Sequence, residues 1–471
     1  MDTKKLRQKI LDLAIHGKLV PQDPNDEPAS VLLERIRAEK ERLIAEGKIK
    51  RSKKSATSDT SHYENVPFEV PEGWCWCSIS DICSKIGSGS TPRGSNYAEH
   101  GIPFFRSQNV YNDGLVYDDI KYISEDVHKS MIGTEVLPKD LLLNITGGSL
   151  GRCAVVPSEF ERGNVSQHVC ILRTVQVLPE YLHCFIISDY FSDTMILSGS
   201  GREGLPKYSL EAMMIPIPPL AEQSRIVSSI VQLITFVNSI EGSITDILQS
   251  VQVAKSKILD LAIHGKLVPQ DPNDEPASEL LKRINPKFVP CDNAHYENVP
   301  NSWCWTTLGE VCELITGSTP SKLHPEYYGG DFPFYKPTDL DVGRHVAIPS
   351  EFLTGEGKKV SRVIPVGATA ICCIGSIGKC GYIEKEGATN QQINTAVPSK
   401  SLHPLYLYYF CNSTFFVEEL TADSSAITIS IVNKSKLSKM LIPIPPYKEQ
   451  QRIVTKIEKL LVVLDNISAE L

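Results

Sequence analysis

Two glycine-rich turns far apart in the sequence carry side chains suited to reading DNA bases. "GSGSTPRGSNY" contains Arg93, and "TGSTPSKLHPEYY" contains Lys322 at the corresponding place. Downstream, "PFFRSQNV" supplies Arg106, Gln108 and Asn109, where "PFYKPTDL" supplies Lys336 and Thr338. Arginine and lysine pair with guanine, and glutamine and asparagine pair with adenine. Any one of these residues is more often a solvated surface group, so the prediction depends on their recurrence with different identities.

No pattern in the sequence predicts catalysis. "GSIGKC" is too short for a phosphate-binding loop, and "SGSGREG" lacks the dinucleotide spacing. The helical H-E-x-x-H and the nucleophile motif G-x-S-x-G are both missing. The 13 cysteines lie mostly in apolar stretches without paired CxxC spacing, which favours buried, reduced thiols over a metal site. His16 and His264 lie in identical segments, which favours a structural or partner-facing role. We therefore expect a non-enzymatic protein with no cofactor or metal of its own.

Composition predicts a soluble, cytoplasmic protein that does not enter a membrane. Hydrophobic residues make up 41% and charged residues 22% of the 471 residues, and no run approaches 18 apolar residues. The formal net charge of −8 argues mildly against non-specific nucleic-acid binding. Residues 69–218 contain 11 basic and 18 acidic side chains, and residues 303–446 contain 12 and 13. Specific reading needs only a few well-placed side chains, so this balance does not exclude it.

An internal repeat of about 230 residues organises the chain. "W-C-W", "GSTP" and "GSLGRC/GSIGKC" recur in the same order in both halves, and "IPIPPLAEQSRIV" recurs as "IPIPPYKEQQRIV". "KILDLAIHGKLVPQDPNDEPAS" is identical at 9–30 and 257–278, whereas the regions between W-C-W and IPIPP keep only landmarks. Identical flanks around divergent middles indicate that the flanks share a partner and that the middles differ in what they bind.

The flanking segments predict long helices. From Ile226 to Leu261 the apolar residues alternate at spacings of four and three, which is the heptad pattern of a coiled coil. Shorter seams begin at Ile453 and at Leu6. The predicted coil and interface residues are Ile226, Ile230, Leu233, Val237, Ile240, Ile244, Ile258, Ile453, Ile457, Leu460 and Leu464.

The two chain ends together correspond to one central helix. Leu471 aligns with Ile244 and Met1 with Gln249, so about four residues separate the two terminal pieces. This favours a circular repeat opened inside one coil over a tandem repeat with frayed ends. Short apolar runs broken by Gly, Pro, Asn and Ser predict that the two middle regions are mixed α/β.

These features together resemble the specificity subunit of type I restriction–modification systems. The resemblance covers essentially the whole chain and is carried by the two I-P-I-P-P-x-x-E-Q-x-R-I-V motifs, the helices after them and the circular repeat. "F-R-S-Q-N-V", "SQHVCIL" and "TNQQINTAV" are similar to landmarks of that family's target recognition domains.

The resemblance implies an α/β (α+β) fold. Two target recognition domains would be separated by long helices forming an antiparallel coiled coil with a pseudo-two-fold repeat. The implied divisions are a helical region at 1–46, a linker at 47–64, recognition domain 1 at 65–218, a central helical region at 219–285, recognition domain 2 at 286–446 and a C-terminal helix at 447–471.

The resemblance also implies that each recognition domain reads one half of a split, asymmetric site on double-stranded DNA. The predicted DNA-contacting residues are Ser90, Thr91, Arg93, Arg106, Gln108, Asn109, Arg152, Gln167, Arg202, Lys207, Thr319, Lys322, Lys336, Thr338, Lys379, Asn390, Gln391 and Lys434. The helices would fix the gap between half-sites, because half-site spacing follows protein geometry.

The implied partners are two modification (methyltransferase) subunits and the restriction subunits. S-adenosylmethionine, ATP and Mg²⁺ would be bound by those partners. Two alternatives remain from the residues alone. One is a non-enzymatic coiled-coil scaffold that joins two protein-binding modules, and the other is an enzyme such as a fused methyltransferase, which the missing motifs disfavour.

Overall fold

A computed structural model describes residues 2–51, 66–92, 94, 97–198, 204–291, 299–422 and 431–471. The chain forms two units, Met1–Ser243 and Ile244–Leu471. Their boundary falls inside the longest helix, α8 (Leu220–Ile263), so this helix contributes residues to both units. The 47–64 segment expected as a linker lies, from residue 52 onward, outside the described residues.

Unit 1 consists of an α/β domain at 66–218, called α/β domain 1, and of helices that precede and follow this domain in the sequence. Its first sheet has the antiparallel order β2-β11-β8-β9, and its second has the order β6-β3-β10-β7, in which β3 and β10 are parallel. The bounds are β2 Cys83–Ser88, β11 Val169–Thr174, β8 Leu141–Asn144, β9 Cys153–Val155, β6 Lys121–Ile123, β3 Ile102–Phe105, β10 Gly163–Val165 and β7 Glu135–Val136. A hairpin joins β4 (Val110–Tyr111) to β5 (Gly114–Leu115).

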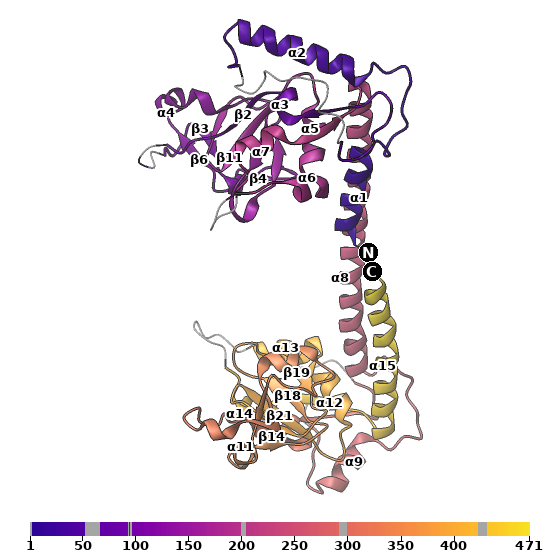
Figure 1. Ribbon diagram of the computed structural model, residues 1–471. Coiled ribbons are helices and arrows are strands. Elements are labelled where there is room, and N and C mark those ends of the chain that lie inside the picture. The colour runs from indigo at the N-terminus through magenta and orange to yellow at the C-terminus, as the bar shows by residue number, and fades with distance from the viewer. Residues whose placement is uncertain are drawn as a thin grey trace. The chain divides into compact units, whose positions relative to one another are not determined.

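The helices of unit 1 are mostly short, except for those outside the α/β domain. They are α1 Thr3–Ile15, α2 Ala29–Ala45, α3 Ile79–Ile82, α4 Glu125–Ser130, α5 Pro179–Ile186, α6 Asp189–Thr194 and α7 Lys207–Ala212, followed by the first half of α8. Figure 1 shows α1 lying alongside this half of α8. Arg7 of α1 donates to Glu241 of α8 at 2.7 Å, while the loop after α1 contacts the start of α8, so the two helices are antiparallel.

Unit 2 repeats this architecture around a domain at 299–446, called α/β domain 2. Its sheets have the orders β14-β21-β18-β19 and β16-β15-β20-β17, with β15 and β20 parallel. The bounds are β14 Cys312–Thr316, β21 Ile393–Pro398, β18 Thr369–Cys372, β19 Cys380–Tyr382, β16 Glu351–Leu353, β15 Tyr328–Tyr335, β20 Gly387–Thr389 and β17 Val363–Ile364. Its helices are α9 Ala277–Ile284, α10 Leu308–Val311, α11 Gly355–Lys359, α12 Pro404–Cys411, α13 Thr414–Thr421, α14 Lys434–Lys439 and α15 Tyr447–Glu470.

The repeated IPIPP and W-C-W motifs form a two-stranded sheet at the base of each α/β domain. In unit 1, β1 (Cys75–Ser78) pairs with β12 (Met214–Ile217), and Trp76 lies opposite Pro216. In unit 2, β13 (Cys304–Thr307) pairs with β22 (Leu441–Ile444) in the same way. A proline can occupy these strands because a two-stranded sheet leaves one backbone edge of each strand unpaired. The next two prolines precede α8 and α15, so the chain passes directly from the sheet into the long helix.

All eleven predicted seam residues are buried or half-buried. Ile226, Ile230, Val237, Ile453 and Ile457 are buried. Leu233, Ile240, Ile244, Ile258, Leu460 and Leu464 are half-buried. Lys255 of α8 pairs with Asp465 of α15 at 2.5 Å, which links the two helices of the pair in unit 2.

At the end of α8 the buried residues are no longer those that the heptad pattern predicts. There the buried residues are Leu259, Ala262 and Ile263, while the predicted Ile258 and Leu261 are only half-buried. The reason is that this end of α8 packs in one hydrophobic cluster with Trp303 of α/β domain 2, as well as facing α15. The heptad prediction considered only a helix partner and therefore missed this shift.

Candidate nucleic-acid interface

The E-Q-x-R motif at the start of α8 connects three separate segments of unit 1. Glu222, which is 1% exposed, accepts a hydrogen bond from Trp74 Nε1 at 2.9 Å and one from Gln22 Nε2 at 3.0 Å. Trp74 lies just before β1, and Gln22 belongs to the copied segment after α1. One carboxylate thus holds the segment before α/β domain 1, the first strand region of that domain and the helix that follows it.

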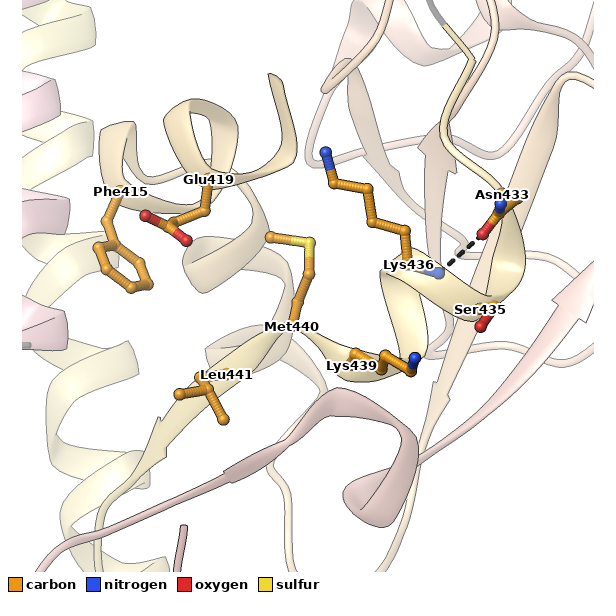
Figure 2. Close-up of a pocket in the computed structure, with 8 residues that line it drawn as sticks. All are labelled: Phe415, Glu419, Asn433, Ser435, Lys436, Lys439, Met440 and Leu441. Atoms are coloured by element: carbon orange, nitrogen blue, oxygen red, sulfur yellow. Dashed lines mark hydrogen bonds between the residues drawn. The ribbon is translucent and has the colours of Figure 1, made fainter. Parts of the chain in front are cut away.

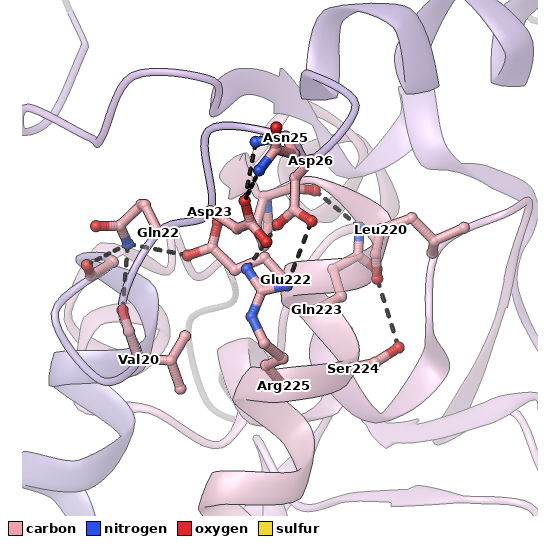
Figure 3. A network of polar contacts seen from close by, with 12 residues as sticks. Val20, Gln22, Asp23, Asn25, Asp26, Leu220, Glu222, Gln223, Ser224 and Arg225 are labelled. Carbon is pink, nitrogen blue, oxygen red and sulfur yellow. Dashed lines mark hydrogen bonds and ion pairs between the residues drawn. The ribbon is translucent and has the colours of Figure 1, made fainter.

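The two neighbouring polar side chains of the motif extend this connection. Gln223 is fully buried; its Oε1 accepts from Leu178 N at 3.0 Å, and its Nε2 donates to Pro218 O at 3.1 Å. Arg225 forms an ion pair with Asp26 of the copied segment, with 2.6 Å between Nη2 and Oδ2. Figure 3 shows Gln22, Asp26, Glu222, Gln223 and Arg225 converging on one helical turn.

We call this set (Gln22, Asp26, Trp74, Glu222, Gln223 and Arg225) clamp 1, and its counterpart in unit 2 is clamp 2. Glu449 accepts from Trp303 Nε1 at 3.0 Å and from Gln270 Nε2 at 2.6 Å. Gln450 accepts from His403 N at 2.7 Å, and Arg452 donates to Asp274 Oδ2 at 2.7 Å. Burial raises the pKa of Glu449 above its ordinary value of 4.5, although its hydrogen bonds act in the opposite direction.

The two clamps account for much of the identity between the copied segments. Each copy docks on the E-Q-x-R motif of its own unit, and that motif is itself repeated. Gly17 has φ of +65°, and a Cβ there would lie 2.3 Å from Pro71 Cγ. A Cβ on Gly265 would likewise lie 2.4 Å from Pro300 Cγ. The shared partner expected for the copies is therefore at least partly within the chain.

Two of the predicted DNA-reading turns lie together in each α/β domain. In domain 1, the GSTP turn donates from Ser90 N to Val165 O at 3.1 Å. In domain 2, Ser318 N donates to Thr389 O at 2.9 Å. A Cβ on Gly89 would lie 1.9 Å from Val165 O, so only glycine allows this approach. We call the two sets reading turns 1 (Ser90, Thr91, Ser166 and Gln167) and reading turns 2 (Ser318, Thr319, Asn390 and Gln391).

The side chains at the tips of the reading turns are exposed. Ser90, Thr91 and Gln167 face solvent in domain 1, and Thr319 and Gln391 do so in domain 2. The Thr319 hydroxyl donates to Gln391 Oε1, which orients the amide. Asn390 is 9% exposed and donates from Nδ2 to Gln392 Oε1 at 2.9 Å, so it supports the turn from inside.

Asn109 is a buried residue whose side chain holds the local backbone. It is fully buried, its Oδ1 accepts from Arg106 N at 3.1 Å, and its Nδ2 donates to Val116 O at 3.0 Å. Its hydrogen-bonding groups hold the chain reversal, so the structure gives no support to the predicted DNA contact of Asn109. Its neighbour Gln108 is exposed. Arg106 is half-buried and donates from Nη2 to Asp119 O at 2.8 Å.

Several other predicted cations already have partners inside the protein. Lys336 pairs with Glu351 at 2.9 Å, Lys379 with Asp341 at 2.5 Å and Lys207 with Glu211 at 3.4 Å. The Arg152 guanidinium lies 4.7 Å from the Tyr111 ring centroid. Lys322, Thr338 and Lys434 are exposed. Arg93 and Arg202 lie outside the described residues.

A basic pocket of about 450 Å³ lies beside α14. Figure 2 shows Lys436 and Lys439 on one side of it and Phe415 and Glu419 on another. Lys436 and Lys439 were not among the predicted residues, although the "KSKLSK" run, which places three lysines within six residues, could have indicated them.

Of the 13 cysteines, Cys75 and Cys291 are half-buried and the other 11 are buried. Burial raises the pKa of the Cys83 and Cys170 thiols to about 12, so both stay protonated near neutral pH. Within the described ranges, no group of three or more His, Cys, Asp or Glu residues is placed to hold a metal ion. One described helix, α8, is long and apolar enough to cross a membrane by length and composition alone. Such a single helix is weak evidence, and α8 also packs against α1 and contains charged residues that pair with α1 and α15.

Comparisons with known proteins agree with this architecture. A family model described as the type I restriction modification DNA specificity domain matches residues 71–249 and 300–470. The chain is 26% identical to the EcoAI specificity subunit of Escherichia coli, covering 97% of this chain and 89% of that protein. It is 27% identical to the EcoEI specificity subunit of Escherichia coli, covering 99% and 90%.

Two solved structures share the fold. A chain from a type I restriction–modification system studied for complex assembly aligns with a TM-score of 0.64 at 19% identity, covering 86% of this chain and 95% of that one. The HsdS subunit from Thermoanaerobacter tengcongensis aligns with a TM-score of 0.54 at 19% identity, covering 85% and 93%.

Proposed function

The chain belongs to the type I restriction modification DNA specificity family, and from this premise we propose how its two units select a DNA sequence. Each α/β domain binds one half of a split, asymmetric site on double-stranded DNA. Reading turns 1 and 2 contribute base contacts, and the long helices set the gap between the half-sites. The family membership favours this function over a scaffold for two protein-binding modules.

The observation that carries the proposal is the paired construction of the reading turns. In both domains a GSTP turn lies against a second polar turn, and the backbone contacts are equivalent. The exposed threonine and glutamine are the same in both domains, and the half-buried residue after the glutamine differs, being His168 in domain 1 and Gln392 in domain 2. A shared backbone with different hydrogen-bonding groups suits two readers of two different half-sites.

We propose that the chain itself performs no chemistry. Two modification subunits would methylate the DNA and bind S-adenosylmethionine, and restriction subunits would bind ATP and Mg²⁺. The acidic balance of α/β domain 1 fits this division, since partner subunits can supply phosphate contacts that this domain lacks. The complex would act in the cytoplasm, where its DNA is.

We propose that the modification subunits dock on the helix pairs. Phe236 of α8 is 65% exposed, and Val463, at the equivalent place in α15, is 55% exposed. Large apolar side chains exposed at equivalent positions of two helices are typical of a repeated protein interface. Two copies of one partner would use these positions, one in each unit.

Methylation mapping tests this function. The chain is produced with its modification subunit in a host without other adenine methylation, and modified adenines are located by long-read sequencing. The expected result is one split, asymmetric motif in which both halves are methylated. Methylation without a split motif, or no methylation from an assembled complex, would contradict the proposal.

A further inference from the structure

The clamps place buried charge where the chain enters and leaves each α/β domain. Within the described residues four carboxylates are buried, namely Asp140, Glu222, Asp274 and Glu449, and three of these belong to the clamps. Replacing buried ionic groups with apolar ones often leaves stability unchanged or raises it, so such groups are weak evidence for a stabilising role. Their directional hydrogen bonds instead specify one arrangement of the parts that they join.

The parts joined by clamp 1 are those that fix the orientation of α/β domain 1. Trp74 precedes the first strand of the domain, Glu222 and Gln223 follow its last strand, and Gln223 also holds the backbone at the start of α5. The Tyr181 hydroxyl of α5 donates to Pro216 O in β12 at 2.7 Å, which ties the same helix to the exit strand. A single turn of α8 is therefore bonded to the first and last strand regions and to an internal helix of the domain.

Clamp 2 makes the equivalent connections between α15 and α/β domain 2. Gln450 holds His403 N at the start of α12, and the Tyr406 hydroxyl donates to Pro443 O at 2.8 Å. Equivalent polar bonds recur although the α/β domains differ in sequence. This recurrence indicates that both domains share one requirement. Base recognition is not that requirement, because it differs between the two domains.

We propose that Glu222 and Glu449 are positioning residues that hold each α/β domain at a fixed orientation on its long helix, and thereby make the complex select one gap between half-sites. This inference rests on the proposed function. With a clamp weakened, the domain keeps its own reading turns but can tilt on the helix. The bases recognised in each half-site then stay the same, while sites with a longer or shorter gap become acceptable.

The test compares Glu222→Gln and Glu449→Gln in the full complex with the modification subunit. In each variant the amide keeps one acceptor and loses the other, so either the tryptophan or the glutamine donor is left without its partner. The measurement is the methylated fraction of a plasmid library in which both half-sites are constant and the gap varies one base pair at a time. Glu34→Gln, an exposed position on α2, is the matched control.

The expected result is unchanged half-site bases in both variants and about a tenfold rise in methylation at gaps one base pair from the preferred one, the order of effect of one lost buried hydrogen bond. Glu34→Gln should match the wild type. A purely structural role predicts lower methylation with the same gap preference, and that outcome would overturn the inference. A wild-type library without any split motif would instead overturn the proposed function.

Milder variants keep the test decisive if the glutamine variants fail to assemble. Trp74→Phe and Trp303→Phe each remove one donor to the carboxylate and keep an aromatic ring. Trp76→Phe is the control, because the Trp76 Nε1 donates to Phe68 O and not to the clamp. Relaxed gap preference in the first two and not in the third is expected, and equal behaviour of all three contradicts the inference.

Discussion

At the scale of single residues, burial decides which polar side chains are free to read DNA. Asn109 and Gln167 are both of a type that pairs with adenine, yet Asn109 is fully buried and bonded on both sides while Gln167 is exposed at a turn. From the sequence, both residues are equally good candidates for base contacts. The sequence shows the residue type and the turn, but not which side-chain atoms are already bonded to the backbone. The structure separates the two.

A substitution in either set of reading turns should alter recognition of one half-site only. Gln167→Ala should weaken recognition through the half read by domain 1, and Gln391→Ala through the half read by domain 2. Because a bidentate amide contact discriminates by about 1–3 kcal/mol, each change should lower methylation of the preferred site about tenfold or more. Methylation of libraries randomised in each half-site measures this.

The two glutamine variants serve as controls for each other. Gln176→Ala, an exposed position outside the reading turns, should leave both halves unchanged. A loss of selectivity in both half-sites from either Gln167→Ala or Gln391→Ala would show that these side chains act through the fold and not on bases.

His183 predicts a dependence of stability on pH. Burial lowers the pKa of His183 below its ordinary value of 6.5, and this effect outweighs the opposing contact of its ring Nε2 with Cys153 O at 2.9 Å. The unfolded chain therefore binds a proton near pH 6.5 that the folded chain does not bind until lower pH. The contribution of the neutral His183 to stability is fully present above pH 6.5 and is lost as the pH falls below it.

Calorimetric unfolding midpoints measured at several pH values check this. His183→Gln should lose less stability than the wild type between pH 7.5 and roughly pH 5.5, where the ring titrates in the unfolded chain. His100→Gln, an exposed histidine of the same unit, should follow the wild type. Parallel curves for wild type and His183→Gln would contradict the assignment.

At the scale of elements, periodicity predicts the helices well and their lateral contacts poorly. The spacing from Ile226 to Leu261 matches one continuous helix, and Leu141–Asn144 and Thr369–Cys372 are strands within the apolar runs. The clamps could not be predicted in this way, because Gln22 and Glu222 are separated by 200 residues and no local pattern pairs them. The repetition of both motifs was the available signal.

Gly17 tests the docking of the copied segment on its unit. Gly17 and Gly47 both have positive φ, +65° and +69°, but a Cβ on Gly17 would meet Pro71 whereas one on Gly47 meets nothing within 4 Å. Gly47→Ala should therefore lower the unfolding midpoint by about 2–4 °C, the effect of about 1 kcal/mol of backbone strain in a unit of this size. Gly17→Ala adds overpacking and should lower it by about three times as much. Equal shifts would mean that the segment does not dock tightly.

The length of α8 predicts the gap between half-sites. At 1.5 Å per residue, the 44 residues of α8 span about 66 Å. Inserting one heptad after Ser243 keeps the apolar seam in register and lengthens the helix by about 10 Å. Methylation mapping of this variant should show the same two half-sites with a longer gap. An active complex with an unchanged gap would show that α8 does not set the spacing.

At the scale of the whole molecule, two units with one topology carry two different polar surfaces. Both units have the same strand order in their four-stranded sheets, and each has a helix pair and a clamp. They differ in the half-buried residue after the exposed glutamine of each reading turn, His168 or Gln392, and in α14, where Lys434, Lys436 and Lys439 correspond to a helix in unit 1 that carries Lys207 and Glu211. The repeat and the helical seam made this organisation predictable, whereas the residues that face DNA depend on burial and pairing.

Exchange of one α/β domain tests the central claim most directly. Residues 69–218 are replaced with the corresponding region of another family member, and the methylated motif of the hybrid complex is mapped by long-read sequencing. The account predicts that one half of the split motif changes to the donor's half while the other half and the gap stay as they were. A motif in which both halves change, or neither, would contradict the account.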